Sequence, residues 1–248
     1  MVIDLRLDGR TALVTGAGRG LGRAIADGLA ELGATVYGTS RDAASAEAIA
    51  SRYGTSPVVL DLLDAHGIRS ALSALDAVAE VDLLVNNAGV NVPQRALDVD
   101  PDSWDLVFDT NVRGAFFTSQ ALAAGWVRRG VAGTIVNVGS QAGSVAIEER
   151  AAYGSSKAAL AQLTKVLALE WAPAGIRVNA VAPTFVRTEL TESTLSDPAW
   201  AAELLARIPL GRFGDPEDIV GAVAYLSGRQ SSLVTGHTLA IDGGYTIR

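Results

Sequence analysis

Cysteine is absent from the sequence, which excludes disulfide bonds and thiolate metal sites. The two histidines, His66 and His237, lie too far apart to form a metal-binding motif. No apolar stretch approaches the roughly 18 residues that a membrane-spanning helix needs. The N-terminus, "MVIDLRLDGR", also lacks the basic start and long apolar run of a signal peptide. We therefore expect a cytoplasmic protein with no metal site and no membrane partner.

Positive charge is also scarce. Lys plus Arg total 20 against 27 Asp plus Glu, which gives a net charge of -7 and argues against a nucleic-acid partner. Apolar residues make up 49% of the 248 residues and charged residues 19%. The folded surface is therefore expected to include an apolar patch that a second copy of the chain covers. The composition predicts a homo-oligomer.

Short apolar runs alternate along the chain with alanine-rich helical stretches. Runs that are apolar throughout are typical of strands covered on both faces, and their alternation with helices predicts a parallel sheet. The predicted strands are residues 11–15, 35–39, 57–61, 81–85, 133–138, 176–182 and 237–241. We expect a single α/β domain over residues 1–248, with a doubly wound (Rossmann-type), seven-stranded parallel sheet and helices on both faces.

Residues 184–212 interrupt this alternation. They are expected to form one or two short helices between the sixth strand and a last helix, for which Asp215 is the predicted N-cap and Pro216 the first-turn residue. An insertion after the carboxyl end of a parallel strand lies where a ligand enters. We expect residues 184–212 to be a substrate lid.

The first strand leads into the glycine-rich turn "TGAGRGLG", residues 15–22. Glycines at this point let the backbone approach a pyrophosphate, and the following helix directs its N-terminal amides at the same anion. The turn therefore predicts a dinucleotide-binding site. The alternative is a tight strand-to-helix turn that binds nothing.

The end of the second strand, "YGTSRD", bears on which dinucleotide binds. An NAD-binding site would have an acidic residue here for the adenosine ribose, whereas this chain has Ser40 and Arg41. With Arg19 from the glycine-rich turn, two guanidinium groups are available for a ribose 2'-phosphate. This favours NADP(H) as the cofactor. NAD(H) remains the alternative, in which Asp42 would bind the ribose hydroxyl groups.

The segment "AAYGSSKAAL" places Tyr153 and Lys157 four residues apart, on one face of a predicted helix. Random placement of five tyrosines and two lysines gives only about 0.04 such pairs. A nearby ammonium group lowers the pKa of a phenol toward neutral pH, which suits proton transfer. Ser140, 13 residues earlier, follows the fifth strand and can orient a substrate oxygen. The alternatives are a helix N-cap for Ser140 and a core tyrosine for Tyr153.

Five segments in order, "TGAGRGLG", "NNAG" (86–89), "TNVRGAFF" (110–117), "VNVGS" (136–140) and "YGSSK" (153–157), resemble the short-chain dehydrogenase/reductase family over the whole chain. The resemblance implies that Tyr153 is the general acid/base and that Lys157 lowers its pKa and binds the nicotinamide ribose. It also implies that Ser140 holds the reacting oxygen and that Asn111 anchors a proton-relaying water chain. A homotetramer built through residues 101–129 and 151–172 is the family habit.

The same resemblance gives a set of cofactor-binding residues, among them Asp61 at the adenine and Thr188 at the nicotinamide end. The "APTFVRT" segment (182–188) departs from the family pattern, which more often has glycine after the proline, so the conformation of this loop is open. The expected residues are Gly16, Gly18, Arg19, Gly20, Leu21, Gly22, Ser40, Arg41, Asp61, Leu62, Asn87, Ala88, Gly89, Tyr153, Lys157, Pro183, Thr184, Val186 and Thr188.

The expected reaction is hydride transfer between the nicotinamide and a secondary alcohol or ketone. The candidate substrate residues are Gln141, Val145, Phe185 and Leu190. Polar neighbours such as Glu148, Glu149 and Arg187 would suit a polyol, sugar or sugar acid, and the apolar residues a simple ketone. A 3-oxoacyl-[acyl-carrier-protein] reductase is an alternative that would use a basic docking patch, for which Arg128 and Arg129 are the adjacent pair. A non-catalytic dinucleotide-binding scaffold is an alternative of another class.

Overall fold

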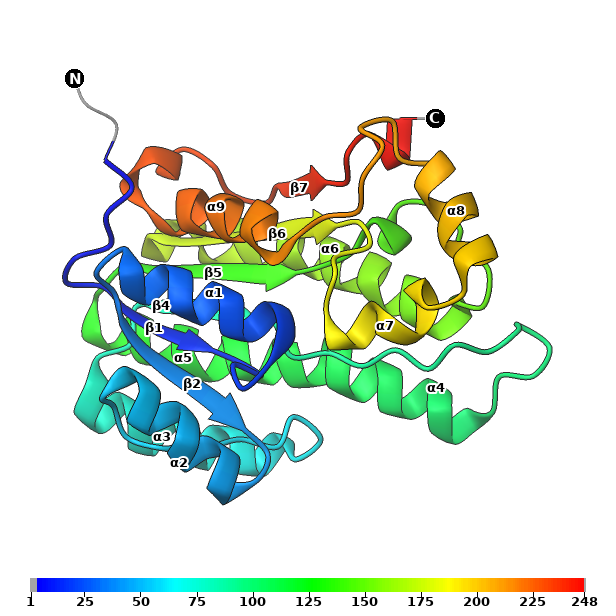
Figure 1. Ribbon diagram of the computed structural model, residues 1–248. Helices are drawn as coiled ribbons and strands as arrows, with labels where there is room; N and C mark the ends of the chain where they lie inside the picture. Colours follow the sequence, from blue (N-terminus) through cyan, green and yellow to red (C-terminus); the bar gives the residue numbers. More distant parts are fainter. Residues whose placement is uncertain (1–3, 248) are drawn as a thin grey trace.

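The computed structural model describes residues 4–247, apart from the side chains of residues 76, 77, 190, 193 and 194. At its centre is a seven-stranded sheet with the order β3-β2-β1-β4-β5-β6-β7, in which every pairing is parallel (Figure 1). The strands are β1 (Thr11–Val14), β2 (Thr35–Ser40), β3 (Val58–Val59), β4 (Leu83–Asn86), β5 (Gly133–Val138), β6 (Ile176–Pro183) and β7 (Thr238–Ile241). The predicted doubly wound parallel sheet is confirmed.

Helices cover both faces of this sheet (Figure 1). Leu13 and Val14 are neighbours in β1 and point to opposite faces, so each contributes to a different core. Val14 packs with Ile25 and Val223, while Leu13 packs with Leu122. The covering helices are α1 (Gly20–Glu31), α2 (Ala43–Tyr53), α3 (Ala65–Ala79), α5 (Ala115–Arg129), α6 (Ala151–Trp171) and α9 (Pro216–Ser227). Among residues 4–247, no helix is both long and apolar enough to cross a membrane.

Residues 101–129, one of the two segments through which the family resemblance implies assembly, form a helix that is not uniform. It begins as α4 (Pro101–Phe108), widens into the π-helical segment η1 (Asp109–Gly114) and continues as α5. The π-helical segment contains Asn111, whose side chain is buried. Such segments inside α-helices frequently mark functional sites.

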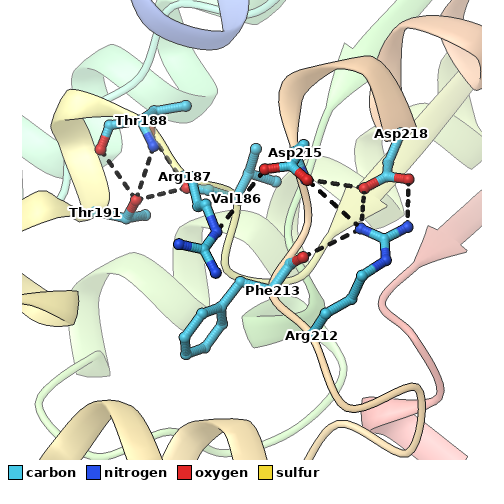
Figure 2. A network of polar contacts seen from close by, with 8 residues as sticks. All are labelled: Val186, Arg187, Thr188, Thr191, Arg212, Phe213, Asp215 and Asp218. Atoms are coloured by element: carbon cyan, nitrogen blue, oxygen red, sulfur yellow. Dashed lines mark hydrogen bonds and ion pairs between the residues drawn. The ribbon is translucent and has the colours of Figure 1, made fainter. Parts of the chain in front are cut away.

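Residues 184–212 form two short helices, α7 (Glu189–Leu195) and α8 (Pro198–Ala206), as predicted. The two ends of this excursion are tied together, because Val186 forms a β-bridge with Gly214 and the Arg187 backbone N–H donates to the Gly214 carbonyl at 2.9 Å. Figure 2 shows the polar network around this base, in which Arg212 forms a two-pronged ion pair with Asp218. The segment therefore leaves and re-enters the domain at one point.

Candidate functional site

A cavity of about 1070 Å³ lies at the carboxyl ends of the strands. Its walls come from the turns that follow β1, β2, β4, β5 and β6, and from the start of α6 and α7. The strand order reverses between β1 and β4, and ligands of doubly wound sheets bind at such a switch point. The volume is at the upper end of the range for ligand sites, so the cavity has room for a large ligand.

The glycine-rich turn forms one wall of this cavity. Gly16 has φ 66°, and a Cβ there would approach the Ala88 Cβ to 3.1 Å, so only glycine fits without strain. At Gly22 a Cβ would clash with the Asn87 side chain and the Gly16 carbonyl. The next helix, α1, has Arg19 at its N-cap, and that side chain does not cap it. Its first amides are thus available to an anion such as a pyrophosphate.

The end of β2 supplies a second wall of the cavity. Ser40 and Arg41 both line it, and the Arg41 side chain is exposed to it. Asp42 is the N-cap of α2: one carboxylate oxygen accepts the Ser45 backbone N–H at 2.8 Å and the other accepts the Ser40 hydroxyl at 3.1 Å. Arg19 lines the same cavity and forms an exposed ion pair with Glu189 of α7 at 3.1 Å.

All of the residues predicted to bind the cofactor line this one cavity, from Gly16 in the first turn to Thr188 before α7. They come from the segments that follow β1, β2, β3, β4 and β6 and from the first turns of α6, so the fold and not local spacing brings them together. The glycine wall, the free helix terminus and the cationic Arg41 fit a phosphate-bearing dinucleotide.

Tyr153 and Lys157 lie on the first two turns of α6, and Ser140 follows β5. Lys157 is buried, and its Nζ donates a hydrogen bond to the Val138 carbonyl at 2.8 Å. The same Nζ lies 5.6 Å from the centroid of the Tyr153 ring. The Ser140 hydroxyl accepts the Ala142 backbone N–H at 3.2 Å, so Ser140 also caps a helical turn. The predicted N-cap and the predicted site residue are therefore the same side chain.

Burial dominates the ionisation of this pair. It raises the pKa of the Tyr153 phenol, while a hydrogen bond with Ser140 and the charge of Arg150 act in the opposite direction. Burial also lowers the pKa of Lys157 to about 8. In the protein alone, desolvation of the phenol outweighs the charges near it, and Arg150 is the cation that acts against this rise in the pKa. That Lys157 lowers the pKa of Tyr153 stays a prediction.

Asn111 lies behind the cavity wall. Its side-chain amide donates to the Val90 carbonyl at 2.9 Å and to the Ser156 hydroxyl at 3.0 Å, and its oxygen accepts the Val90 N–H at 2.8 Å. The Ser156 hydroxyl in turn donates to the Tyr153 carbonyl at 2.7 Å. Asn111 thus connects the loop after β4 to the first turn of α6.

A side pocket of about 70 Å³ opens beside Ser140 and Tyr153. Five of its residues also line the large cavity, so the two spaces meet at the tyrosine. Gln141 and Phe185 line it as predicted for the substrate. Its lining consists of Asn91, Ser140, Gln141, Ala142, Ile147, Arg150, Tyr153, Thr184, Phe185 and Thr191.

Known proteins with similar sequences and structures place this chain in a family. Residues 16–246 match a family model described as enoyl-(acyl carrier protein) reductase. The L-xylulose reductase of Mesocricetus auratus is 44% identical over 246 residues, 99% of this chain and 100% of its own. A short-chain type dehydrogenase/reductase from Mycobacterium marinum has a TM-score of 0.91 at 37% identity and covers 99% of this chain and 98% of its own.

The chain belongs to the short-chain dehydrogenase/reductase family. A third similar protein is a gluconate 5-dehydrogenase from Burkholderia cenocepacia, whose crystal structure contains NADP and tartrate. It has a TM-score of 0.96 at 36% identity, over 99% of this chain and 98% of its own. Membership makes the protein an NAD(P)-dependent oxidoreductase that acts on CH–OH groups.

One of the predicted substrate residues of this short-chain dehydrogenase/reductase, Val145, is not found at the side pocket. Val145 lines neither cavity, because it packs against the small apolar cluster that includes Leu204 and Phe213. The side chain of Leu190 lies outside the described residues. Glu148 and Glu149 are exposed and are not among the lining residues of either cavity.

The sequence reasoning missed Asn91, Arg150 and Thr191, which line the side pocket. Arg150 lies three residues before Tyr153, but it is the N-cap of α6 and has non-helical backbone angles, so helical spacing does not place it at the pocket. For Asn91, two residues after "NNAG", and for Thr191, in α7, no local pattern indicates that they reach the pocket.

Proposed function

We propose that this protein is an NADP(H)-dependent oxidoreductase that interconverts a secondary alcohol and a ketone on a small polyhydroxylated molecule, namely a polyol, a sugar or a sugar acid. One observation carries the proposal: Ser140 and Tyr153 line both the large cavity and the side pocket. A cofactor in the first and a substrate in the second would meet at the phenol. When bound, the nicotinamide supplies the capacity to accept or donate a hydride.

The chain's own residues manage the oxygen and its proton. Ser140 donates a hydrogen bond to the substrate oxygen and holds it beside Tyr153, which takes the hydroxyl proton in oxidation and returns it in reduction. Lys157 binds the nicotinamide ribose and adds positive charge near the phenol. Asn111 fixes the first turn of α6 through Ser156 and anchors the water that relays the proton.

The phosphate-bearing cofactor would be held by the walls of the large cavity. The glycine-rich turn and the N-terminus of α1 take the pyrophosphate, Asp61 the adenine, and Thr188 the nicotinamide end. Arg41 and Ser40 take the 2'-phosphate. Asp42, the alternative ligand for an NAD ribose, is already engaged in capping α2, which supports NADP(H).

The proposed substrate class agrees with the polar lining of the side pocket, where asparagine, glutamine, threonine and arginine side chains occur. The relatives named for L-xylulose and gluconate point the same way. A 3-oxoacyl-[acyl-carrier-protein] reductase is not favoured, because its acyl chain would meet this polar lining. Enoyl reduction is also disfavoured, since the family's enoyl reductases place tyrosine and lysine further apart.

Three wider features belong to the same proposal. Residues 1–248 form a single dinucleotide-binding and catalytic domain. Residues 184–212 act as a lid within it, supported by the shared base at Val186 and Gly214. The lid bears directly on the large cavity through Thr188, Glu189 and Thr191. The protein is a cytoplasmic homotetramer, supported by its composition and the family habit.

The decisive experiment is turnover measured at 340 nm with NADP(H) and NAD(H) on polyols, sugar acids, simple secondary alcohols and their ketones. We expect activity on a polyhydroxylated substrate, and we expect Tyr153→Phe to lower kcat by roughly 10³-fold or more while NADPH binds normally. Nucleotide affinity is checked by fluorescence titration of both proteins. Near-full activity in Tyr153→Phe would refute the proton-transfer role of Tyr153. Normal nucleotide binding without turnover of any compound tested would favour the non-catalytic scaffold.

A further inference from the structure

The side pocket has a marked charge asymmetry. Among its described lining residues, Arg150 is the charged one, and no carboxylate lines the pocket opposite it. Arg150 is the N-cap of α6, is partly buried, and lies three residues before Tyr153. Its Nη1 donates a hydrogen bond to the Glu149 carbonyl at 3.2 Å, and the side chain lines the same pocket as Ser140 and Tyr153.

We infer that the side pocket binds a polyhydroxy acid, with Arg150 holding its carboxylate and the neighbouring amide and hydroxyl side chains holding its hydroxyl groups. This inference rests on the proposed function and narrows its substrate class from polyols, sugars and sugar acids to the last of these. Arg150 is then the residue that selects an acid over the neutral polyol of the same configuration.

The first argument is the electrostatics of Arg150. Its planar group of N–H donors matches a carboxylate, and charge-assisted bonds of this kind are about twice as strong as neutral ones. Burial lowers the pKa of Arg150, with Glu149 and Tyr153 acting in the opposite direction. Partial removal from water thus disfavours the cation, and a bound anion offsets that effect. A neutral polyol offers no such compensation.

The second argument concerns three oxygen atoms around the same pocket. Asn91 Oδ1, Gln141 Oε1 and Thr184 Oγ1 are buried and have no hydrogen-bond partner within residues 4–247. Buried polar atoms without partners are unfavourable, and they are rare in folded proteins. Hydroxyl groups supply the missing donors, whereas a carboxylate alone supplies none. The ligand therefore needs hydroxyl groups as well as an anionic end.

A rival cation on the lid does not meet these requirements. Arg187 has a side chain that is 64% exposed, lies 3.8 Å from Asp215, and stacks over the Phe213 ring at 5.7 Å (Figure 2). It lines neither of the two cavities. Arg187 consequently serves as a matched control for Arg150: a guanidinium group near the entrance that does not face the substrate.

The test uses pairs of compounds in which the acid has a carboxylate where the polyol has a hydroxymethyl group. The pairs are D-gluconate and D-glucitol, D-galactonate and galactitol, and D-threonate and D-threitol. Oxidation with NADP⁺ is measured for the unmodified protein, Arg150→Gln, Arg150→Lys and Arg187→Gln. Thermal melting shows that each variant is folded. Because each ratio is taken within a pair, the unknown stereochemical preference cancels.

We expect the acid to exceed its polyol in kcat/KM by roughly 10- to 100-fold in the best pair, in line with hydrogen bonds to charged groups. Arg150→Gln should abolish this preference, mainly through a higher KM for the acid, with Arg150→Lys intermediate and Arg187→Gln unchanged. The inference is overturned if the unmodified protein prefers the polyols, or if Arg150→Gln lowers both members of a pair equally.

Absence of turnover with every pair would count against the proposed function. In that case the binding of each acid and each polyol is measured instead, and it decides whether Arg150 holds a carboxylate. Melting temperatures with NADP⁺ and each compound are compared between the unmodified protein and Arg150→Gln. A rise with the acid that requires Arg150 supports the carboxylate site even without turnover. An equal rise with acid and polyol, or no rise with either, rejects it.

Discussion

At the scale of single residues, burial moves the pKa values of Tyr153 and Lys157 in opposite directions and away from each other. The pKa of the phenol rises above its usual 10.0, and the pKa of the ammonium group falls from 10.5 to about 8, because burial removes water from both groups. The protein without cofactor therefore holds a neutral phenol beside a weakened cation. Arg150 is the cation that acts against the raised pKa of the phenol in this state.

The lowered pKa of Lys157 makes a prediction about stability without cofactor. Between about pH 8 and 10.5 the unfolded chain holds the lysine proton and the folded chain does not, so stability rises with pH across this window. The shift corresponds to about 3 kcal/mol of unfavourable burial below pH 8, against roughly 1 kcal/mol for the bond to Val138. Lys157→Met should thus be more stable at pH 7, by roughly 2 kcal/mol, and lose its advantage by pH 10.5.

Urea unfolding at pH 7 and pH 10.5 measures this difference. Lys165→Met is the matched control, since Lys165 is the other lysine of α6 and its side chain is exposed. It should leave stability nearly unchanged at both pH values. A Lys157→Met protein that is less stable than the parent at pH 7 would show that burial does not penalise this charge.

Arg41 allows a test of cofactor choice at the same scale. If its guanidinium group binds the 2'-phosphate, Arg41→Ala should weaken NADPH binding by roughly 10- to 100-fold and NADH binding by less than about threefold. Fluorescence titration with both nucleotides measures the two losses. Arg69→Ala, an exposed arginine of α3 that does not line the cavity, is the control. Equal losses for both nucleotides in Arg41→Ala would make Arg41 a solvated loop residue.

At the scale of elements, the sequence predicts those parts of the fold that local signals specify. Asp215 and Pro216 mark the start of α9, and the Asp218 carboxylate accepts the Asp215 N–H at 2.8 Å as in a capping box. The apolar runs predict all seven strands, although β3 pairs only through Val58 and Val59. Val59 is 46% exposed, as expected at the edge of a sheet.

The π-helical segment at Asn111 could not be read from the sequence. It depends on tertiary contacts, because the Asn111 side chain bonds to Val90 after β4 and to Ser156 in α6. The residues of the side pocket could not be predicted from the sequence for the same reason. Gln94 forms a β-bridge with Arg150, and this contact between distant loops puts Arg150 at the pocket wall. The cofactor side was predictable because its glycine, acidic and hydroxyl residues lie in short motifs at strand ends.

At the scale of the whole molecule, apolar side chains are exposed on the outer faces of two long helices. Val127 of α5 is 56% exposed, and Val166 and Leu169 of α6 are 39% and 78% exposed. These are the helices through which the family resemblance implies assembly. Apolar groups clustered on one face are a common mark of a protein–protein interface.

The assembly gives the last prediction. Light scattering at micromolar concentration should give a mass of about 102 kDa, four chains of 25.6 kDa each, because paired two-fold contacts close into a tetramer. Leu169→Asp places a charge in the proposed interface and should shift the mass to dimers or monomers. Val78→Asp, at a 73% exposed position on α3, which is not one of the two helices of the proposed interface, should leave the mass unchanged. A mass near 26 kDa for the unmodified protein would show that the α5 and α6 faces are ordinary surface, and that the monomer carries the complete site.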